Sequence, residues 1–91
     1  MDIEQLRPRI DAIDDQVLDL LAQRAGAALE VGDYKKRRGL PVHDPERENS
    51  VVNRVQTRNQ GPLSSEAIER IYRTIIEEMR KLEESHVRAA G

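Results

Sequence analysis

The sequence predicts an all-α protein with three helices in a single domain, residues 1–91. Hydrophobic residues make up 37% of the chain and charged residues 35%, and only two residues are aromatic. This balance is typical of amphipathic helices and leaves no material for a large aromatic core. Apolar residues recur at alternating spacings of three and four, and we find no period-two alternation typical of strands. Glycine and proline residues separate the chain into three segments with this helical spacing.

The first helix is predicted over residues 3–38. Asp2 suits the N-cap position and Gln5 completes a capping box, whereas Gly39 and the proline two residues later end the helix. Pro8 predicts either a kink or a regular helix that begins near it. The apolar residues form two adjacent heptad rows: Ile3, Ile10, Val17 and Val31 in one, and Leu6, Ile13, Leu20, Ala27 and Tyr34 in the other.

The second helix is predicted over residues 45–59. Asp44 is its N-cap, Pro45 occupies the first helical position, and the Gly61-Pro62 pair follows its end. These local signals therefore define both ends of the second helix.

The third helix is predicted over residues 65–85. It follows Ser64, and Leu63 and Ile68 are spaced as a hydrophobic staple. The last residues, 87–91, are expected to fray.

The length of the first helix predicts a homodimer. At 1.5 Å per residue it would measure roughly 55 Å, whereas a compact chain of this size has a radius of gyration of about 12 Å. The helix must therefore extend beyond its own core. A second copy of the chain in an intertwined two-fold dimer is the simplest cover for the exposed apolar rows.

Arg24 interrupts the first apolar row. A buried guanidinium needs a carboxylate or phosphate partner, which a core glutamate, a helix end or a bound anion could supply. Arg7 and Lys35 flank the same rows, so this helix face is also suited to hold an anion. Arg24 lies roughly 16 Å along the helix from Lys35 but roughly 25 Å from Arg7. If Arg7 belongs to the same site, it must come from the other subunit.

Other features argue against several kinds of partner and chemistry. A net charge of −2 gives no general attraction to nucleic acid or membranes, and the basic run 35–38 suits a helix C-terminus. No cysteine, signal-like segment or membrane-spanning stretch occurs, which predicts a cytoplasmic protein. His43 and His86 lie far from any metal-ligand spacing and are expected in surface or cap roles, so we expect no metal or cofactor.

Short motifs follow one another in a fixed order: Leu6-Arg7, Ile10-Asp11-Ala12-Ile13-Asp14, Leu20 to Arg24, Glu30-Val31-Gly32 with Lys35, Gly39-Leu40-Pro41-Val42, and Asp44 to Glu48. Together they resemble the all-helical chorismate mutases, in register from about Leu6 to Glu83. Members of this family are free-standing enzymes or N-terminal domains of bifunctional mutase/prephenate dehydratases. The resemblance implies conversion of chorismate to prephenate, a pericyclic step without cofactor, metal or nucleophile. The catalyst must hold a dicarboxylate in a compact shape and stabilise charge on its ether oxygen.

The resemblance also implies roles for particular residues. Arg24 would bind one carboxylate, Arg7 of the partner chain the other, and Lys35 the ether oxygen. Glu48 and the backbone near Asp44 would meet the ring hydroxyl, with the N-cap role of Asp44 retained.

Three further positions follow from the same resemblance. Arg47 would line the pocket, and a solvated helix start is the lesser alternative for Arg47 and Glu48. Met79 stands where many members have a small donor such as serine, and Glu83 stands where many have glutamine. Ionised glutamate only accepts hydrogen bonds, so Glu83 would have to be protonated to serve the ether oxygen. Isochorismate-pyruvate lyase and a non-catalytic helical dimerisation or regulatory module are the alternative functions.

Overall fold

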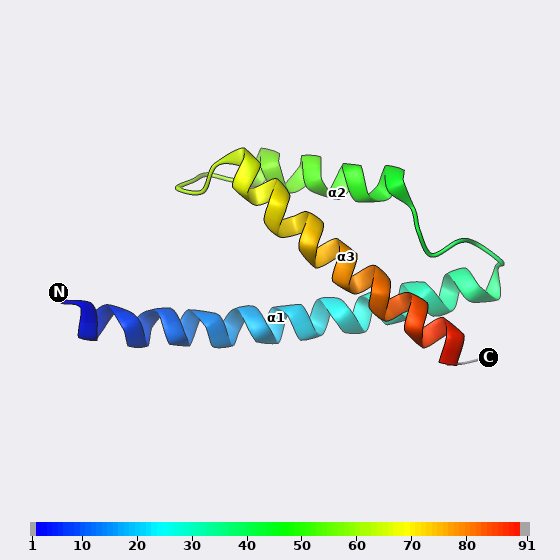
Figure 1. Ribbon diagram of the computed structural model, residues 1–91, viewed down its shortest axis with the longest axis horizontal. Coiled ribbons are helices and arrows are strands. Elements are labelled where there is room, and N and C mark those ends of the chain that lie inside the picture. Colours follow the sequence, from blue (N-terminus) through cyan, green and yellow to red (C-terminus); the bar gives the residue numbers. More distant parts are fainter. Residues whose placement is uncertain (1, 90–91) are drawn as a thin grey trace.

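A computed structural model describes residues 2–89 and contains three helices in this range, with no strand (Figure 1). They are α1 (Ile3–Arg37), α2 (Pro45–Arg58) and α3 (Ser65–Ala89). The predicted all-α fold is confirmed. Helices α1 and α2 each end one residue before the predicted boundary, because Arg38 and Asn59 are their C-caps.

Both ends of α1 form as their residues predict. Asp2 accepts a hydrogen bond from the backbone of Gln5, and the Gln5 side chain accepts one from the backbone of Asp2. At the other end Gly39 has φ of 66°, and Leu40 N donates to Lys35 O at 2.8 Å. This left-handed turn satisfies carbonyls that the last helical turn leaves free. Helix α1 runs through Pro8, so the alternative of a start near Pro8 is wrong.

Side-chain caps also fix α2 and α3. Asp44 accepts a hydrogen bond from Arg47 N at 3.1 Å, and Ser64 Oγ accepts one from Ala67 N at 3.1 Å. Between the helices, Gln56 Nε2 donates to Ser65 O at 3.0 Å. These contacts hold α2 beside the first turns of α3.

Helix α3 is longer than predicted, because its last turns pack on α1. A Cβ built at Gly32 would lie 3.5 Å from Glu83 Cβ and 3.8 Å from Val87 Cγ2, which marks a close helix crossing. His86 Nε2 lies 2.9 Å from Asp33 Oδ1. The predicted fraying is therefore wrong for residues 87–89, whereas Ala90 and Gly91 lie outside the described residues.

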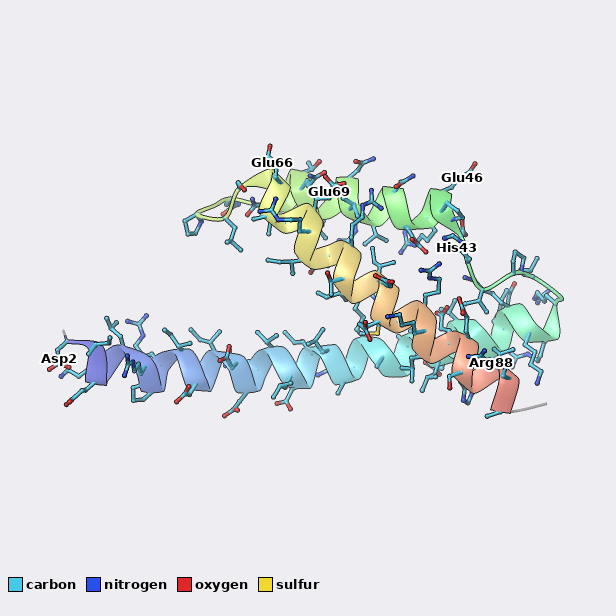
Figure 2. The ribbon with its side chains drawn as sticks, in the orientation of Figure 1. Asp2, His43, Glu46, Glu66, Glu69 and Arg88 are labelled. Atoms are coloured by element: carbon cyan, nitrogen blue, oxygen red, sulfur yellow. The ribbon has the colours of Figure 1, made fainter. Side chains whose placement is uncertain are left out.

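The helices form an elongated frame rather than a closed bundle. Helix α3 contacts both α1 and α2, while the first half of α1 extends away from the other two helices (Figures 1 and 2). The radius of gyration is 16.2 Å, well above the roughly 12 Å of a compact chain of this length. A small core of Val51, Val52 and Ile76, with Tyr72 beside it, joins α2 to α3.

The two heptad rows of α1 are exposed over its first half. Ile10 is 55% exposed and Leu20 61%, which are high fractions for large apolar side chains. The extent of this surface agrees with the predicted overhang. None of the helices in residues 2–89 is both long and apolar enough to cross a membrane.

Candidate functional site

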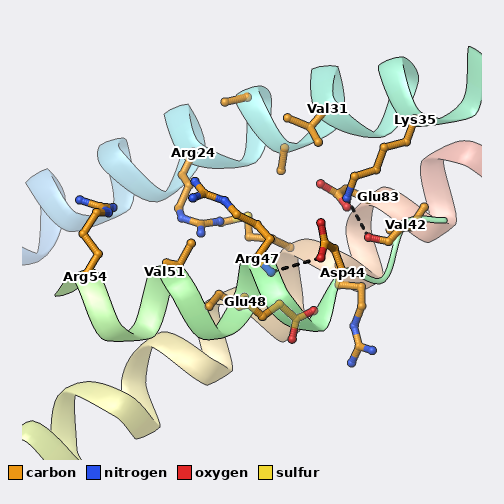
Figure 3. Close-up of a pocket in the computed structure, with 15 residues that line it drawn as sticks. Arg24, Val31, Lys35, Val42, Asp44, Arg47, Glu48, Val51, Arg54 and Glu83 are labelled. Carbon is orange, nitrogen blue, oxygen red and sulfur yellow. Dashed lines mark hydrogen bonds between the residues drawn. The ribbon is translucent and has the colours of Figure 1, made fainter. Parts of the chain in front are cut away.

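A pocket of about 330 Å³ lies where the second half of α1 faces α2 and the later turns of α3 (Figure 3). Its wall includes the loop before α2. The lining residues are Arg24, Ala27, Ala28, Val31, Lys35, Val42, Asp44, Arg47, Glu48, Val51, Arg54, Ile76, Met79, Arg80 and Glu83. The pocket is thus large enough for a small organic molecule and combines an apolar floor with many charges.

Two guanidinium groups converge in this pocket from opposite sides. Arg24 extends from α1 and Arg47 from α2, and both line the pocket between these helices (Figure 3). Within residues 2–89, neither guanidinium makes a hydrogen bond or an ion pair. Like charges in such an arrangement repel, so an anion between them would stabilise both.

Arg54 adds a third cation from the same face of α2, and its side chain also extends toward α1 (Figure 3). Its guanidinium likewise has no hydrogen-bond or ion-pair partner in the described part of the chain.

Because Arg24 has no such partner in residues 2–89 either, the structure does not contain the alternative arrangement, an arginine paired with a core glutamate or a helix end. Arg24 acts on Glu83 only electrostatically: its positive charge lowers the pKa of the Glu83 carboxyl group.

Lys35 is held at the opposite end of the pocket by the loop that follows α1. Its Nζ donates to Val42 O at 2.9 Å and extends toward Glu83 (Figure 3). An ammonium has three donors, so two remain for other acceptors. The turn at Gly39 matters here, because it folds the Val42 carbonyl back over the last turn of α1.

Glu83 is a buried acid, with only 8% of the residue exposed. Burial raises the pKa of its carboxyl group, whereas the positive charges of Lys35 and then Arg24 lower it. The negative charges of Glu84 and Glu48 raise the pKa further. The sequence left open which influence dominates, and in the structure burial does. Protonated Glu83 is a hydrogen-bond donor, a role that ionised glutamate cannot fill.

The acids at the start of α2 complete the polar wall. Asp44 is the N-cap, as predicted, and also lines the pocket. Glu48 lies one turn into α2, with its Oε2 3.5 Å from His43 Nε2. His43 and His86 each contact a carboxylate, and neither lines the pocket. Among residues 2–89 no group of three histidine or acidic side chains is placed to hold a metal ion.

The structure brings together all but one of the predicted site residues. Arg24, Lys35, Asp44, Arg47, Glu48, Met79 and Glu83 line the pocket. Arg7 does not, because it lies on the exposed first half of α1, roughly 25 Å along the helix from Arg24.

Sequence reasoning missed two cations in the pocket, Arg54 and Arg80. Arg54 follows Arg47 by seven residues, which places both on one face of α2, so helical spacing could have revealed it. Arg80 precedes Glu83 by three residues, which places both on one face of α3, so helical spacing could have revealed it as well.

Comparisons with known proteins agree with this geometry. The family profile described as chorismate mutase type II matches residues 6–84. A bifunctional chorismate mutase/prephenate dehydratase of Aquifex aeolicus is 37% identical over 86 residues, which are 90% of this chain and 24% of that protein. The chain thus spans about a quarter of the length of this relative. A chorismate mutase of Methanocaldococcus jannaschii is 37% identical over 54 residues, 59% of this chain and 54% of that protein.

Solved structures match over nearly the whole chain. Chorismate mutase (form II) of Thermus thermophilus has a TM-score of 0.89 and 32% identity, with 90% of this chain and 93% of that chain covered. Chorismate mutase of Helicobacter pylori in complex with prephenate has a TM-score of 0.87 and 30% identity, with 94% and 93% covered.

Proposed function

Because the chain belongs to the chorismate mutase type II family, we propose that it rearranges chorismate to prephenate. The observation that supports this activity most strongly is the unpaired cations Arg24 and Arg47 in one pocket, opposite Lys35 and the buried acid Glu83. These groups complement one carboxylate and the central ether oxygen of a dicarboxylate substrate.

The reaction breaks a carbon–oxygen bond and forms a carbon–carbon bond within one molecule. Negative charge grows on the ether oxygen as its bond to carbon breaks. Lys35 Nζ, already oriented by its hydrogen bond to Val42 O, would donate to that oxygen from one side. Protonated Glu83 would donate from the other side. The pocket would contribute further by holding the flexible substrate in its compact reactive shape.

Arg24 would bind one substrate carboxylate, where the planar guanidinium fork matches the two oxygens. Arg47 would line the same end of the pocket. The ring hydroxyl would be met by Glu48 and by the backbone at Asp44, both at the start of α2.

We further propose that the active form is a homodimer in which Arg7 of the partner chain enters the pocket. The exposed heptad rows, with Ile10 and Leu20 more than half exposed, support a helical partner along α1. A two-fold dimer would create two equivalent sites, each with one Arg7 from the other subunit.

A product assay tests the activity directly. The purified chain should convert chorismate to prephenate and should release no pyruvate from isochorismate. Pyruvate release as the main reaction would favour the lyase. Turnover of neither compound would favour a non-catalytic dimerisation or regulatory module, for which Met79, an apolar residue in the pocket wall, is the main argument.

The raised pKa of Glu83 predicts a pH dependence. The donor form of Glu83 is the protonated one, so kcat/KM should fall as pH rises through its raised pKa. Glutamine keeps an N–H donor at every pH. Glu83→Gln should therefore remove the alkaline decline and raise activity at neutral pH, as measured by parallel pH profiles with chorismate.

The matched control is Glu84→Gln, which removes a neighbouring carboxylate whose charge helps to raise the pKa of Glu83. This variant should keep the decline but shift it to lower pH. If Glu83→Gln retained the decline of the parent, Glu83 would not be the titrating donor.

A further inference from the structure

We infer that Arg80 is an additional substrate-binding residue, which donates to a carboxylate from the α3 wall of the pocket. This inference rests on the proposed function, because it assumes a dicarboxylate substrate. No residue of α3 other than Glu83 and Met79 had been expected to meet the substrate, and neither of these is a cation.

The composition of the α3 wall is the first argument. Among the described residues, α3 contributes Ile76, Met79, Arg80 and Glu83 to the pocket. The first two are apolar, and Glu83 has one proton to donate when protonated. Arg80 is therefore the positively charged residue among those that α3 contributes to the pocket, and it can bind an anion. Met79 itself is buried, with 9% exposed, and presents a thioether that cannot donate.

The second argument is the weak attachment of Arg80 to the protein. Its Nε lies 4.0 Å from Glu84 Oε1, one helical turn away, which is at the limit of an ion pair and beyond hydrogen-bond distance. Its guanidinium makes no hydrogen bond within residues 2–89. The side chain is 28% exposed, less than the 44% of Glu84. Arg80 thus lines the pocket, and within residues 2–89 none of the five donors of its guanidinium has a hydrogen-bonded acceptor.

Arg80 also differs in position from the other pocket cations. Arg24 and Lys35 come from α1, whereas Arg47 and Arg54 come from α2. A dianion held by these four residues alone would be contacted on two sides. Arg80 would close the third side, and the loose contact with Glu84 lets its side chain reorient toward a carboxylate at little cost.

The test compares Arg80→Met, Arg80→Lys and Lys81→Met. Methionine keeps much of the aliphatic stem and removes the charge, so packing and charge effects are separated. Arg80→Met should weaken prephenate binding about tenfold, measured by calorimetry, because a charge-assisted hydrogen bond is lost in a partly solvated site. The KM for chorismate should rise by a similar factor with kcat nearly unchanged. Arg80→Lys should fall between Arg80→Met and the parent.

Lys81→Met is the matched control, since it removes the same charge from the next residue of α3, which does not line the pocket. Lys81 pairs instead with Glu77 and Glu78 at the surface. Equal changes in Arg80→Met and Lys81→Met would overturn the inference, because net charge alone would explain them. Thermal unfolding checks the fold of each variant, and Arg80→Lys decides the question if Arg80→Met is unstable. Inactivity of the unaltered chain toward chorismate would instead contradict the proposed function.

Discussion

Replacing Arg24 with alanine should lower kcat/KM for chorismate by at least about a hundredfold, because Arg24 is proposed to bind a substrate carboxylate. The guanidinium extends from α1 toward Arg47 and makes no hydrogen bond or ion pair with residues 2–89 (Figure 3). Its donors are therefore available to a substrate carboxylate. Without them, the substrate would lose both affinity and orientation.

The same substitution should leave the fold intact. Arg24 is half-buried among apolar side chains without a direct partner, and its removal relieves repulsion from Arg47 and Arg54. The melting temperature of Arg24→Ala should equal or exceed that of the parent. Arg37→Ala, a change of the same kind in the last turn of α1 but outside the pocket, should retain activity. Unfolding of Arg24→Ala would identify Arg24 as a structural residue and would contradict the assignment.

Local signals were sufficient to predict the three helices. The caps at Asp2 and Asp44 and the left-handed Gly39 act within one or two turns, so each can be read without knowledge of the rest of the fold. The overhang of α1 was also predictable, because helix length depends only on the number of residues.

The end of α3 could not be predicted in the same way. Its last turns are stabilised by residues distant in sequence, since His86 contacts Asp33 and Val87 lies against Gly32. Such contacts depend on how α1 and α3 cross, which periodicity does not reveal. A terminus without internal capping signals is expected to fray unless another element packs on it.

Some features of the candidate site could be predicted from the sequence, whereas others could not. Arg24 was visible because a cation in an apolar row is a local conflict, and such conflicts often mark functional positions. The pKa of Glu83 was not predictable, because burial and nearby charges act on it in opposite directions and only a structure gives their balance. Arg80 was missed although it lies three residues before Glu83, a spacing that places both on one face of α3.

Mixed dimers should test the proposed contribution of Arg7 across the interface. Arg7→Ala and Lys35→Ala homodimers should both be nearly inactive, since every site would lack one cation. After subunit exchange between them, each mixed dimer has one site with both residues and one site with neither. Equal amounts should then recover about a quarter of the parental activity, because about half of the dimers are mixed and half of their sites are intact.

The matched control places both changes in one chain and mixes it with the parent. If Arg7 acts across the interface, both sites of that mixed dimer lack one residue, so exchange should reduce the activity of the mixture by about half. If Arg7 acted within its own chain, the parental subunit would keep a complete site and activity would not change on exchange. Helix geometry favours the first outcome, because Arg7 and Arg24 are roughly 25 Å apart along α1 and no side chain spans that distance. Failure of the Arg7→Ala and Lys35→Ala mixture to recover activity after verified exchange would exclude a shared site.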